Sequence, residues 1–246
     1  MMCKVMGIVN VTPDSFSDGG QFFKPEEAIR RAKNLIADGA DIIDLGGEST
    51  RPGATPIGWE EEWSRVEPVL AGLQAIEQSN NQNNRTILSV DTYHPETAEK
   101  AIKAGANIIN CVYADPIPEM LKLLEGNDVE LVMPVSYLSN LSNVSNLSNV
   151  YLDPMIGFNT TREEDIELLR SIPELAKKGR VLVGASRKRI VKKLVGEKSA
   201  VGKNVGGNVA IAVWAAMQGA SAVRVHDVKE TVQALRVVDA LGEGER

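Results

Sequence analysis

The chain has 246 residues, of which 43% are hydrophobic and 24% are charged, a mixture typical of a folded globular protein rather than a disordered one. Its formal net charge of -6 argues against a nucleic-acid-binding surface, which requires a basic face. The cysteines Cys3 and Cys111 lie too far apart for a zinc or redox motif, and no apolar run approaches the ~20 residues that span a bilayer. We therefore predict a cytoplasmic protein with no nucleic-acid and no membrane partner.

Short apolar segments rich in Ile, Val and Leu recur along the chain and have the length of strands buried on both faces. They cover residues 4–9, 41–45, 86–90, 107–112, 130–135, 150–152, 180–184 and 222–225. Amphipathic patterns between them predict helices. These cover residues 25–37, 59–77, 95–104, 117–124, 162–177, 205–217 and 229–241. Alternation of strand and helix without a composition break predicts one domain over residues 1–246, an α/β fold with eight parallel strands, the (β/α)8 TIM barrel.

Glycines follow four of the predicted helices just before the next strand. They are Gly39, Gly105, Gly179 and Gly219. Glycine adopts the left-handed conformation that commonly ends a helix, because it has no Cβ. We expect all four to be left-handed caps.

The connection between the fifth and sixth strands departs from this scheme. Residues 138–150 read LSNLSNVSNLSNV, with an apolar residue at every third position. Ser and Asn are weak helix formers, and a period of three cannot make one stripe along an α-helix. We predict that the helix here is shortened or absent and replaced by an extended or 3₁₀-like segment. An exposed apolar patch on it would favour self-association, so the sequence leaves a homodimer open.

Polar side chains stand at or just after the ends of nearly every predicted strand. Because catalytic groups of a (β/α) barrel come from the C-terminal strand ends, these residues are the candidates for an active site. They are Asn10, Glu48, Ser49, Thr50, Arg51, Asp91, Asn110, Cys111, Asp153, Ser186, Arg187, Lys188, Arg224, His226 and Asp227.

The candidates divide chemically into two sets. The first suits a flat heterocycle, because a carboxylate accepts two parallel N–H bonds while amide and ammonium groups complete the pattern. It comprises Asp91, Asn110, Asp153 and Lys188. The second suits an anionic leaving group, because a planar guanidinium matches phosphate oxygens in pairs and the end of strand eight often holds phosphate. It comprises Asn10, Arg51, Arg224 and His226.

Several of these residues also have a plainer interpretation. Asp227 is an alternative partner for Arg224 and His226, which would then form an ordinary strand end. Cys111 is better explained as a small apolar filler than as a nucleophile, because no base is near it in the sequence. We expect Arg187 to be a solvated neighbour at a helix start, and His94 to begin a helix without a chemical role.

Blocks of sequence, in order along nearly the whole chain, resemble the dihydropteroate synthase family of pterin-binding TIM barrels. The blocks are MGIVNVTPDSFSDGG, GGESTRPGA, SVDT, IIN, LDP followed by IGF, GASRK and RVHDVKET. The resemblance implies a transferase of folate biosynthesis that condenses 6-hydroxymethyl-7,8-dihydropterin diphosphate with 4-aminobenzoate to give dihydropteroate and diphosphate. It also implies that sulfonamides compete with aminobenzoate.

The resemblance further implies a role for each matching residue. The residues matched to the pterin pocket are Asp91, Asn110, Asp153 and Lys188. Those matched to the diphosphate site are Asn10, Arg51, Arg224 and His226, with Mg²⁺ at Asn10. Those matched to the aminobenzoate site are Phe16, Thr50, Pro52 and Ser186. Catalytic roles fall to Asp91, Lys188 and Arg224.

The chain departs from the family pattern at a few positions. Cys111 replaces a usual aspartate, Met155 replaces a usual glycine, Met133-Pro134-Val135 replaces Met-His-Met, and Asn159-Thr160 replaces Gly-Lys. Two alternatives therefore stand beside the synthase: a pterin-binding paralogue without synthase activity, and a folate-dependent methyltransferase on a similar barrel. The paired loops NVTPDSFSDGG and ESTRPGA count against the methyltransferase, whose family lacks them.

Overall fold

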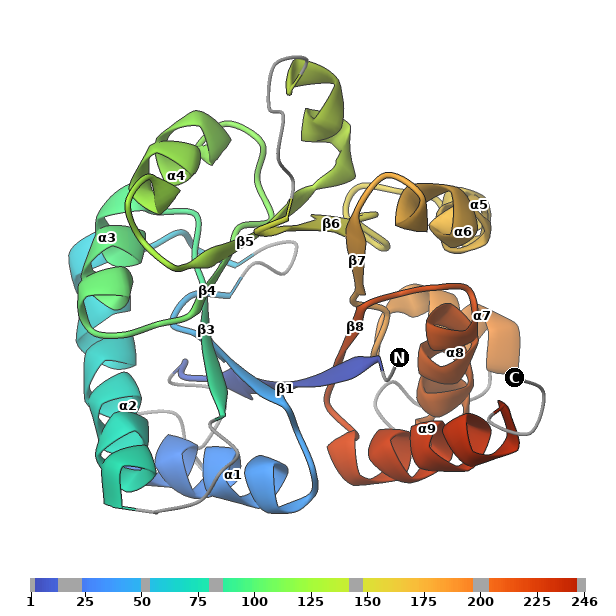
Figure 1. Cartoon of the computed structure of the whole chain (residues 1–246), viewed down its shortest axis with the longest axis horizontal. Coiled ribbons are helices and arrows are strands. Elements are labelled where there is room, and N and C mark those ends of the chain that lie inside the picture. The colour runs from blue at the N-terminus through green and yellow to red at the C-terminus, as the bar shows by residue number, and fades with distance from the viewer. Residues whose placement is uncertain are drawn as a thin grey trace. The chain divides into compact units, whose positions relative to one another are not determined.

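The computed structural model of the protein describes residues 3–12, 24–49, 54–79, 86–141, 148–196 and 204–242. Its strands follow one another in chain order around a closed barrel, β1 to β8, which confirms the predicted (β/α)8 TIM barrel (Figure 1). The strands are β1 Lys4–Asn10, β2 Ile42–Gly46, β3 Ile87–Asp91, β4 Ile108–Asn110, β5 Glu130–Pro134, β6 Val150–Asp153, β7 Arg180–Val183 and β8 Ala222–Val225.

The register of the strands brings polar residues to a common level. Gly46 of β2 lies opposite Asp91 of β3, Asp91 lies opposite Asn110 of β4, and Asn110 lies opposite Val132 of β5. All of these pairings are parallel, so their C-terminal ends share one edge of the sheet. The strands themselves are buried because their Ile, Val and Leu side chains face apolar neighbours on both sides.

The helices mostly coincide with the predicted amphipathic patterns. They are α1 Pro25–Ala37, α2 Trp59–Ser79, α3 Pro95–Lys103, α4 Ile117–Leu124, α5 Arg162–Arg170, α6 Ile172–Ala176, α7 Arg189–Val195, α8 Val205–Met217 and α9 Val228–Gly242. None of the helices within the described residues is long and apolar enough to cross a membrane.

The chain divides into two compact units. The N-terminal unit comprises Ile8–Ala37 and Asp41–Met133, and the C-terminal unit comprises Met1–Gly7, Asp38–Ala40 and Pro134–Arg246. The expectation of a single domain over residues 1–246 stays a prediction.

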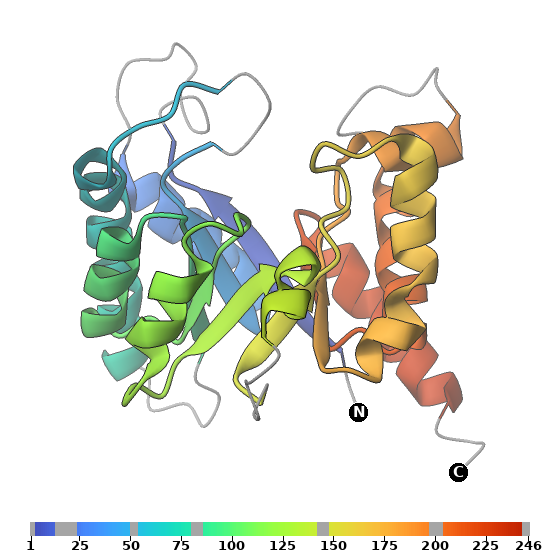
Figure 2. The same ribbon diagram turned by 90° about the horizontal axis from the view of Figure 1, so that it is seen from above.

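In the N-terminal unit, α1, α2, α3 and α4 pack against one another in chain order (Figures 1 and 2). Helix α1 buries Ala28, Ala32 and Leu35, which are spaced for one helical face. At its contact with α2, the Cδ1 of Ile29 lies 2.5 Å from where a Cβ on Gly72 would stand. A side chain at position 72 would therefore require the end of the Ile29 side chain to shift.

In the C-terminal unit, α8 packs against α7, α9 and β8. One predicted helix, residues 162–177, is in fact two, because α5 ends at Arg170 and α6 begins at Ile172. Pro173 explains the break, since it has no N–H to donate to the carbonyl four residues earlier. No amphipathic pattern predicted the short helix α7, although a helix start was expected near Arg187.

Three of the four predicted glycine caps are confirmed. Gly39, Gly105 and Gly219 have φ of 100°, 88° and 98°. The prediction for Gly179 is wrong, because its φ lies outside the left-handed region. Its N–H still donates to the carbonyl of Leu175, so that helix ends without needing the special conformation.

The connection after β5 begins with a 3₁₀ helix, η2, over Val135–Asn140. Leu141 follows it and is buried, with 9% of its surface exposed. The rest of the repeat tract, residues 142–147, lies outside the described residues. The shortened helix between the fifth and sixth strands therefore stays a prediction, although η2 agrees with a 3₁₀-like start.

Candidate active site

In the N-terminal unit, three predicted site residues stand at strand ends. Asn10, Asp91 and Asn110 are the last residues of β1, β3 and β4. Gly46 at the end of β2 leaves space between two of them, because a Cβ there would lie 3.7 Å from Asp91 Cβ and 3.9 Å from Asn10 Oδ1. The structure thus brings Asn10 and Asp91 close to the same point.

A buried network orients the side chain of Asn110. Asp44, which is fully buried, accepts hydrogen bonds from Ser89 Oγ at 2.6 Å and from Asn110 Nδ2 at 3.1 Å. Asn110 Oδ1 is buried and has no hydrogen-bond partner among the described residues. A buried unsatisfied acceptor is unfavourable unless a ligand N–H occupies it. Asn110 therefore offers a preorganised acceptor to a ligand.

The sequence interpretation missed Asp44 and Ser89. The available signal was a polar residue inside each of two otherwise apolar strands, IIDLG and ILSVD. A charged side chain in such a strand is rarely buried without partners.

Cys111 follows Asn110 and is 1% exposed. Its thiol donates to the carbonyl of Tyr113 at 3.4 Å, and burial raises the pKa of the thiol to about 12. A protonated, buried thiol is a poor nucleophile, which agrees with the prediction that Cys111 fills space.

Asp153, Lys188 and Arg224 form the core of the site residues in the C-terminal unit. A Cβ on Gly184, just after β7, would lie 3.8 Å from Arg224 Cβ and 4.0 Å from Lys188 Nζ. Lys188 Nζ donates to the carbonyl of Ile156 at 2.6 Å and lies 4.4 Å from the ring centroid of Phe158. Two cationic side chains therefore converge on the end of β7.

Burial raises the pKa of the Asp153 carboxyl above its usual value. The charge of Lys188, a hydrogen bond at 2.7 Å from the N–H of Met155, and the charge of Arg224 oppose this rise. The side chain is only 5% exposed, so its ionised form gains from every N–H donor that a ligand brings.

Ser186 and His226 contact each other, although the sequence assigns them to different substrates. Ser186 Oγ accepts from the N–H of His226 at 3.3 Å and lies 3.1 Å from His226 Nδ1. When the hydroxyl also donates to Nδ1, the ring proton resides on Nε2. The ring then presents a donor suited to a phosphate oxygen.

Arg187 is exposed and lies just before a helix start, as expected of a solvated neighbour, but its side chain also has a partner. Helix α7 begins at Arg189, and the Arg187 guanidinium donates to Asp227 Oδ1 at 2.8 Å. Asp227 also accepts from Asn208 Nδ2 at 2.7 Å. The sequence indicated no role for Asn208, because its partners are distant along the chain.

Four predicted site residues lie outside the described residues. They are Phe16, Thr50, Arg51 and Pro52. Glu48, which precedes three of them, accepts from Tyr93 Oη at 2.6 Å and from the N–H of Ile57 at 3.2 Å, and lies 3.2 Å from His94 Nε2. His94 thus contacts Glu48, a contact that the sequence did not indicate.

The residues at the end of β1 fit a magnesium ion held largely by its substrate. Mg²⁺ prefers oxygen ligands and commonly takes one or two from the protein and the rest from phosphates and water. Asn10 Oδ1 would supply an oxygen of this kind, and it lies beside the space left by Gly46. Within the described ranges, no cluster of three His, Cys, Asp or Glu residues offers a more complete cage.

Comparison with known proteins identifies the family of the chain. The sequence profile of a family described as pterin binding enzyme matches residues 6–142 and 136–226. A dihydropteroate synthase of Staphylococcus haemolyticus is 38% identical over 264 aligned residues, which cover 98% of this chain and 96% of that protein.

Solved structures give the same result. A dihydropteroate synthase of Clostridium difficile, determined in the presence of pteroic acid, superposes with a TM-score of 0.87 at 34% identity, covering 98% of this chain and 97% of that one. The Xanthomonas albilineans dihydropteroate synthase with 4-aminobenzoic acid superposes with a TM-score of 0.86 at 37% identity, covering 98% of this chain and 94% of that one. Because the similarity extends over nearly the full length, the chain belongs to the dihydropteroate synthases, within the pterin-binding enzymes.

Proposed function

We propose that this protein is a dihydropteroate synthase that condenses 6-hydroxymethyl-7,8-dihydropterin diphosphate with 4-aminobenzoate. Full-length similarity to curated synthases supports the activity. The observation that carries it at the level of the site is the buried Asp153 carboxyl beside Lys188 and Arg224, which a ligand with paired N–H donors would satisfy.

In this proposal four residues bind the pterin. The Asp153 carboxylate accepts the paired N–H groups of the pyrimidine edge, Asn110 Oδ1 accepts a further N–H, and Lys188 donates to a ring acceptor. Asp91 stands near the pterin and stabilises the positive charge that develops on it. The burial of Asp153 supports these assignments, as does Asn110 Oδ1, which has no partner in the part of the chain that the structure describes.

The diphosphate is held by Asn10, Arg51, Arg224 and His226. During the reaction the bond between the pterin methylene carbon and the diphosphate oxygen breaks, and its electron pair leaves with diphosphate. The amine nitrogen of 4-aminobenzoate bonds to that carbon and loses a proton. Cationic groups that stabilise the departing charge supply much of the acceleration.

We propose that 4-aminobenzoate binds at Phe16, Thr50, Pro52 and Ser186. The hydroxyl of Ser186 is buried next to His226. A residue assigned to aminobenzoate therefore contacts one assigned to the diphosphate. Catalytic roles fall to Asp91, Lys188 and Arg224, which act on the developing cation and on the leaving group.

We further propose that Mg²⁺ assists the reaction, with Asn10 as its ligand from the protein. A bound Mg²⁺ would neutralise charge on the diphosphate. The amide oxygen of Asn10 and the space beside Gly46 support this assignment.

The proposal also covers the cellular location of the protein and its partners. Cys3 and Cys111 form no disulfide in the described part of the chain, which suits the reducing cytoplasm. The net charge of -6 suits small anionic substrates held by local cations rather than nucleic acid. Exposed apolar side chains on α7 and α8, such as Leu194 and Met217, support a homodimer.

Turnover by the purified protein tests the proposal. Incubation with Mg²⁺ and both substrates should release diphosphate and form dihydropteroate, and a sulfonamide should compete with aminobenzoate. Binding of the pterin by calorimetry without diphosphate release would instead identify a pterin-binding paralogue. If the protein neither binds the pterin nor releases diphosphate, the assignment of the site is overturned.

A further inference from the structure

The loop that joins β7 to α7 carries residues assigned to both substrates. Ser186 belongs to the aminobenzoate site and Lys188 to the pterin site, and Arg187 lies between them. Arg187 has a φ of 60°, in the left-handed region that a residue with a side chain rarely adopts. Such a conformation persists only where the surroundings hold it. The contacts of Arg187 therefore decide how both neighbours are presented.

Asn208 and Asp227 hold Arg187 through a closed ring of hydrogen bonds. The N–H of Arg187 donates to Asn208 Oδ1 at 3.0 Å, and its guanidinium donates to Asp227 Oδ1 at 2.8 Å. Asn208 Nδ2 donates to Asp227 Oδ2 at 2.7 Å. A reversed Asn208 amide would set N–H against N–H and oxygen against oxygen, so only one orientation satisfies the ring.

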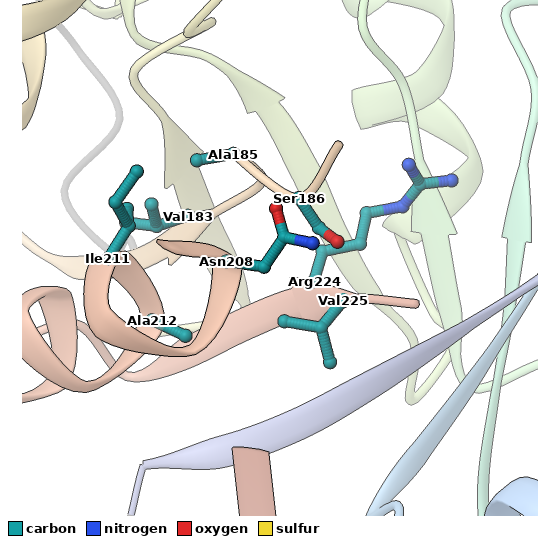
Figure 3. A pocket seen from close by; sticks show the side chains of 8 residues that line it. All are labelled: Val183, Ala185, Ser186, Asn208, Ile211, Ala212, Arg224 and Val225. Atoms are coloured by element: carbon teal, nitrogen blue, oxygen red, sulfur yellow. The ribbon is translucent and has the colours of Figure 1, made fainter. Parts of the chain in front are cut away.

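Burial and a further hydrogen bond hold Asn208 and Asp227 in place. Asn208 is 4% exposed and Asp227 is 9% exposed, and Thr231 Oγ1 donates to the carbonyl of Asp227 at 2.8 Å. Figure 3 shows Asn208 on α8 among Ser186, Ile211 and Ala212, with the guanidinium of Arg224 extending away from it. The cavity between them is about 10 Å³, space for one water, so the Asn208 side chain has little room to change conformation.

We infer that Asn208 and Asp227 are positioning residues of the synthase, which act on Ser186 and Lys188 through the backbone of Arg187. This inference rests on the proposed function. Ser186 is held by the same segment at the end of β8, because its Oγ accepts a hydrogen bond from the N–H of His226, the residue next to Asp227. Two neighbouring contacts thus join the end of β7 to the end of β8 and set the loop that serves both substrates.

An exchange of the two side chains tests the inference. In Asp227→Asn the new amide faces the amide of Asn208, and in Asn208→Asp two carboxylates oppose each other, so each single variant breaks the ring. The double variant N208D/D227N restores every hydrogen bond, with the carboxylate moved to position 208. Kinetic constants for both substrates are measured at a temperature where circular dichroism shows each variant to be folded.

We expect each single variant to raise the KM for both substrates and to lower kcat/KM by roughly 10- to 100-fold, since a displacement of about 1 Å in a site has such an effect. The double variant should recover to within about three-fold of the wild type. Glu163→Gln is the control, because it removes only an exposed ion pair with Lys193 of α7, and its kinetic constants should not change.

An active wild type whose single variants keep both KM values, or a double variant no better than the singles, would overturn the inference alone. A wild type without turnover would overturn the proposed function and the inference with it. If a single variant does not fold, Arg187→Lys tests the same contact, because lysine lacks the planar donor fork. It should raise both KM values, and unchanged values would count against positioning.

Discussion

Among single residues, Asp153 is the one whose replacement we expect to weaken pterin binding most. Replacing it by alanine removes the acceptor for the paired donors of the pterin and leaves them unsatisfied in a buried pocket. We expect a loss of about 2–4 kcal/mol of pterin binding free energy. Calorimetry with the free pterin measures it, and an unchanged affinity would show that the pocket is placed wrongly.

The same residue predicts a dependence on pH. Burial raises the pKa of Asp153, so acidification protonates the carboxyl earlier than in an exposed aspartate. Pterin affinity should therefore rise with pH, and binding should release a proton, which calorimetry in buffers of different ionisation enthalpy detects. Because the folded pKa is raised, the ionised carboxyl lowers stability as pH rises through it. Asp153→Asn should be more stable at neutral pH and bind the pterin without this dependence.

Asp44 should matter although we assign it no contact with substrate. Asp44→Asn gives Asn110 Nδ2 a neighbour that can itself donate, which loosens the orientation of the Asn110 amide. We expect pterin binding to weaken by about 1–2 kcal/mol. Ser89→Ala is the matched control, because it removes a different donor to Asp44 and leaves the Asn110 contact in place. Equal losses in both variants would argue against orientation of Asn110 as the cause.

The two arginines of the diphosphate assignment give a selective prediction. Arg51→Ala and Arg224→Ala should weaken the pterin diphosphate far more than the free hydroxymethyl pterin, because charged hydrogen bonds to the leaving group are lost. Competition binding with both ligands compares the two losses. Similar losses for both ligands would contradict the division of the site into pterin and diphosphate sets.

At the scale of elements, the connection after β5 differs most from a regular unit. It begins with η2, whose residues are not buried, whereas α5 and α6 bury Leu169 and Ile172. Helices gain most of their stability from a packed apolar face, so we predict fast hydrogen exchange over residues 138–150. Protection as strong as that of residues 162–177 would contradict the prediction of a helix-poor crossover.

Two other elements show how local chemistry sets boundaries. Pro173 ends a continuous helix pattern because it lacks an N–H, and this signal was present in the sequence. The short α7 was harder to predict, because seven residues provide too few turns for a clear periodicity. Lys188 precedes it, so the start of α7 also depends on the loop that Asn208 and Asp227 hold.

At the scale of the whole molecule, the proposed homodimer is open to a direct measurement. Met217 of α8 is 65% exposed and Leu194 of α7 is 53% exposed, and burial of such side chains would favour association. Met217→Glu should shift sedimentation from dimer to monomer without loss of helix content. Leu123→Glu on α4 is a control on a different helix. A monomeric wild type would contradict the dimer.

The sequence by itself determined the class of fold and most of the candidate site. Strand and helix periods, glycine caps and the polar residues after each strand are local signals. They place Asp91, Asn110 and Asp153 at strand ends, and Lys188 just after one, before any coordinates are known. The resemblance of the motif blocks then connects these residues to one reaction.

Only the tertiary structure decided which side chains hold the site residues in place. Asp44 and Asn110 are hydrogen-bonded although 66 positions separate them in the sequence, and Arg187 and Asp227 are hydrogen-bonded across a separation of 40 positions. The left-handed conformation of Arg187 had no signature in the sequence, because it depends on those contacts and not on the identity of the residue. Hydrogen bonds between distant strand ends arise from strand register and helix packing, which local patterns do not specify.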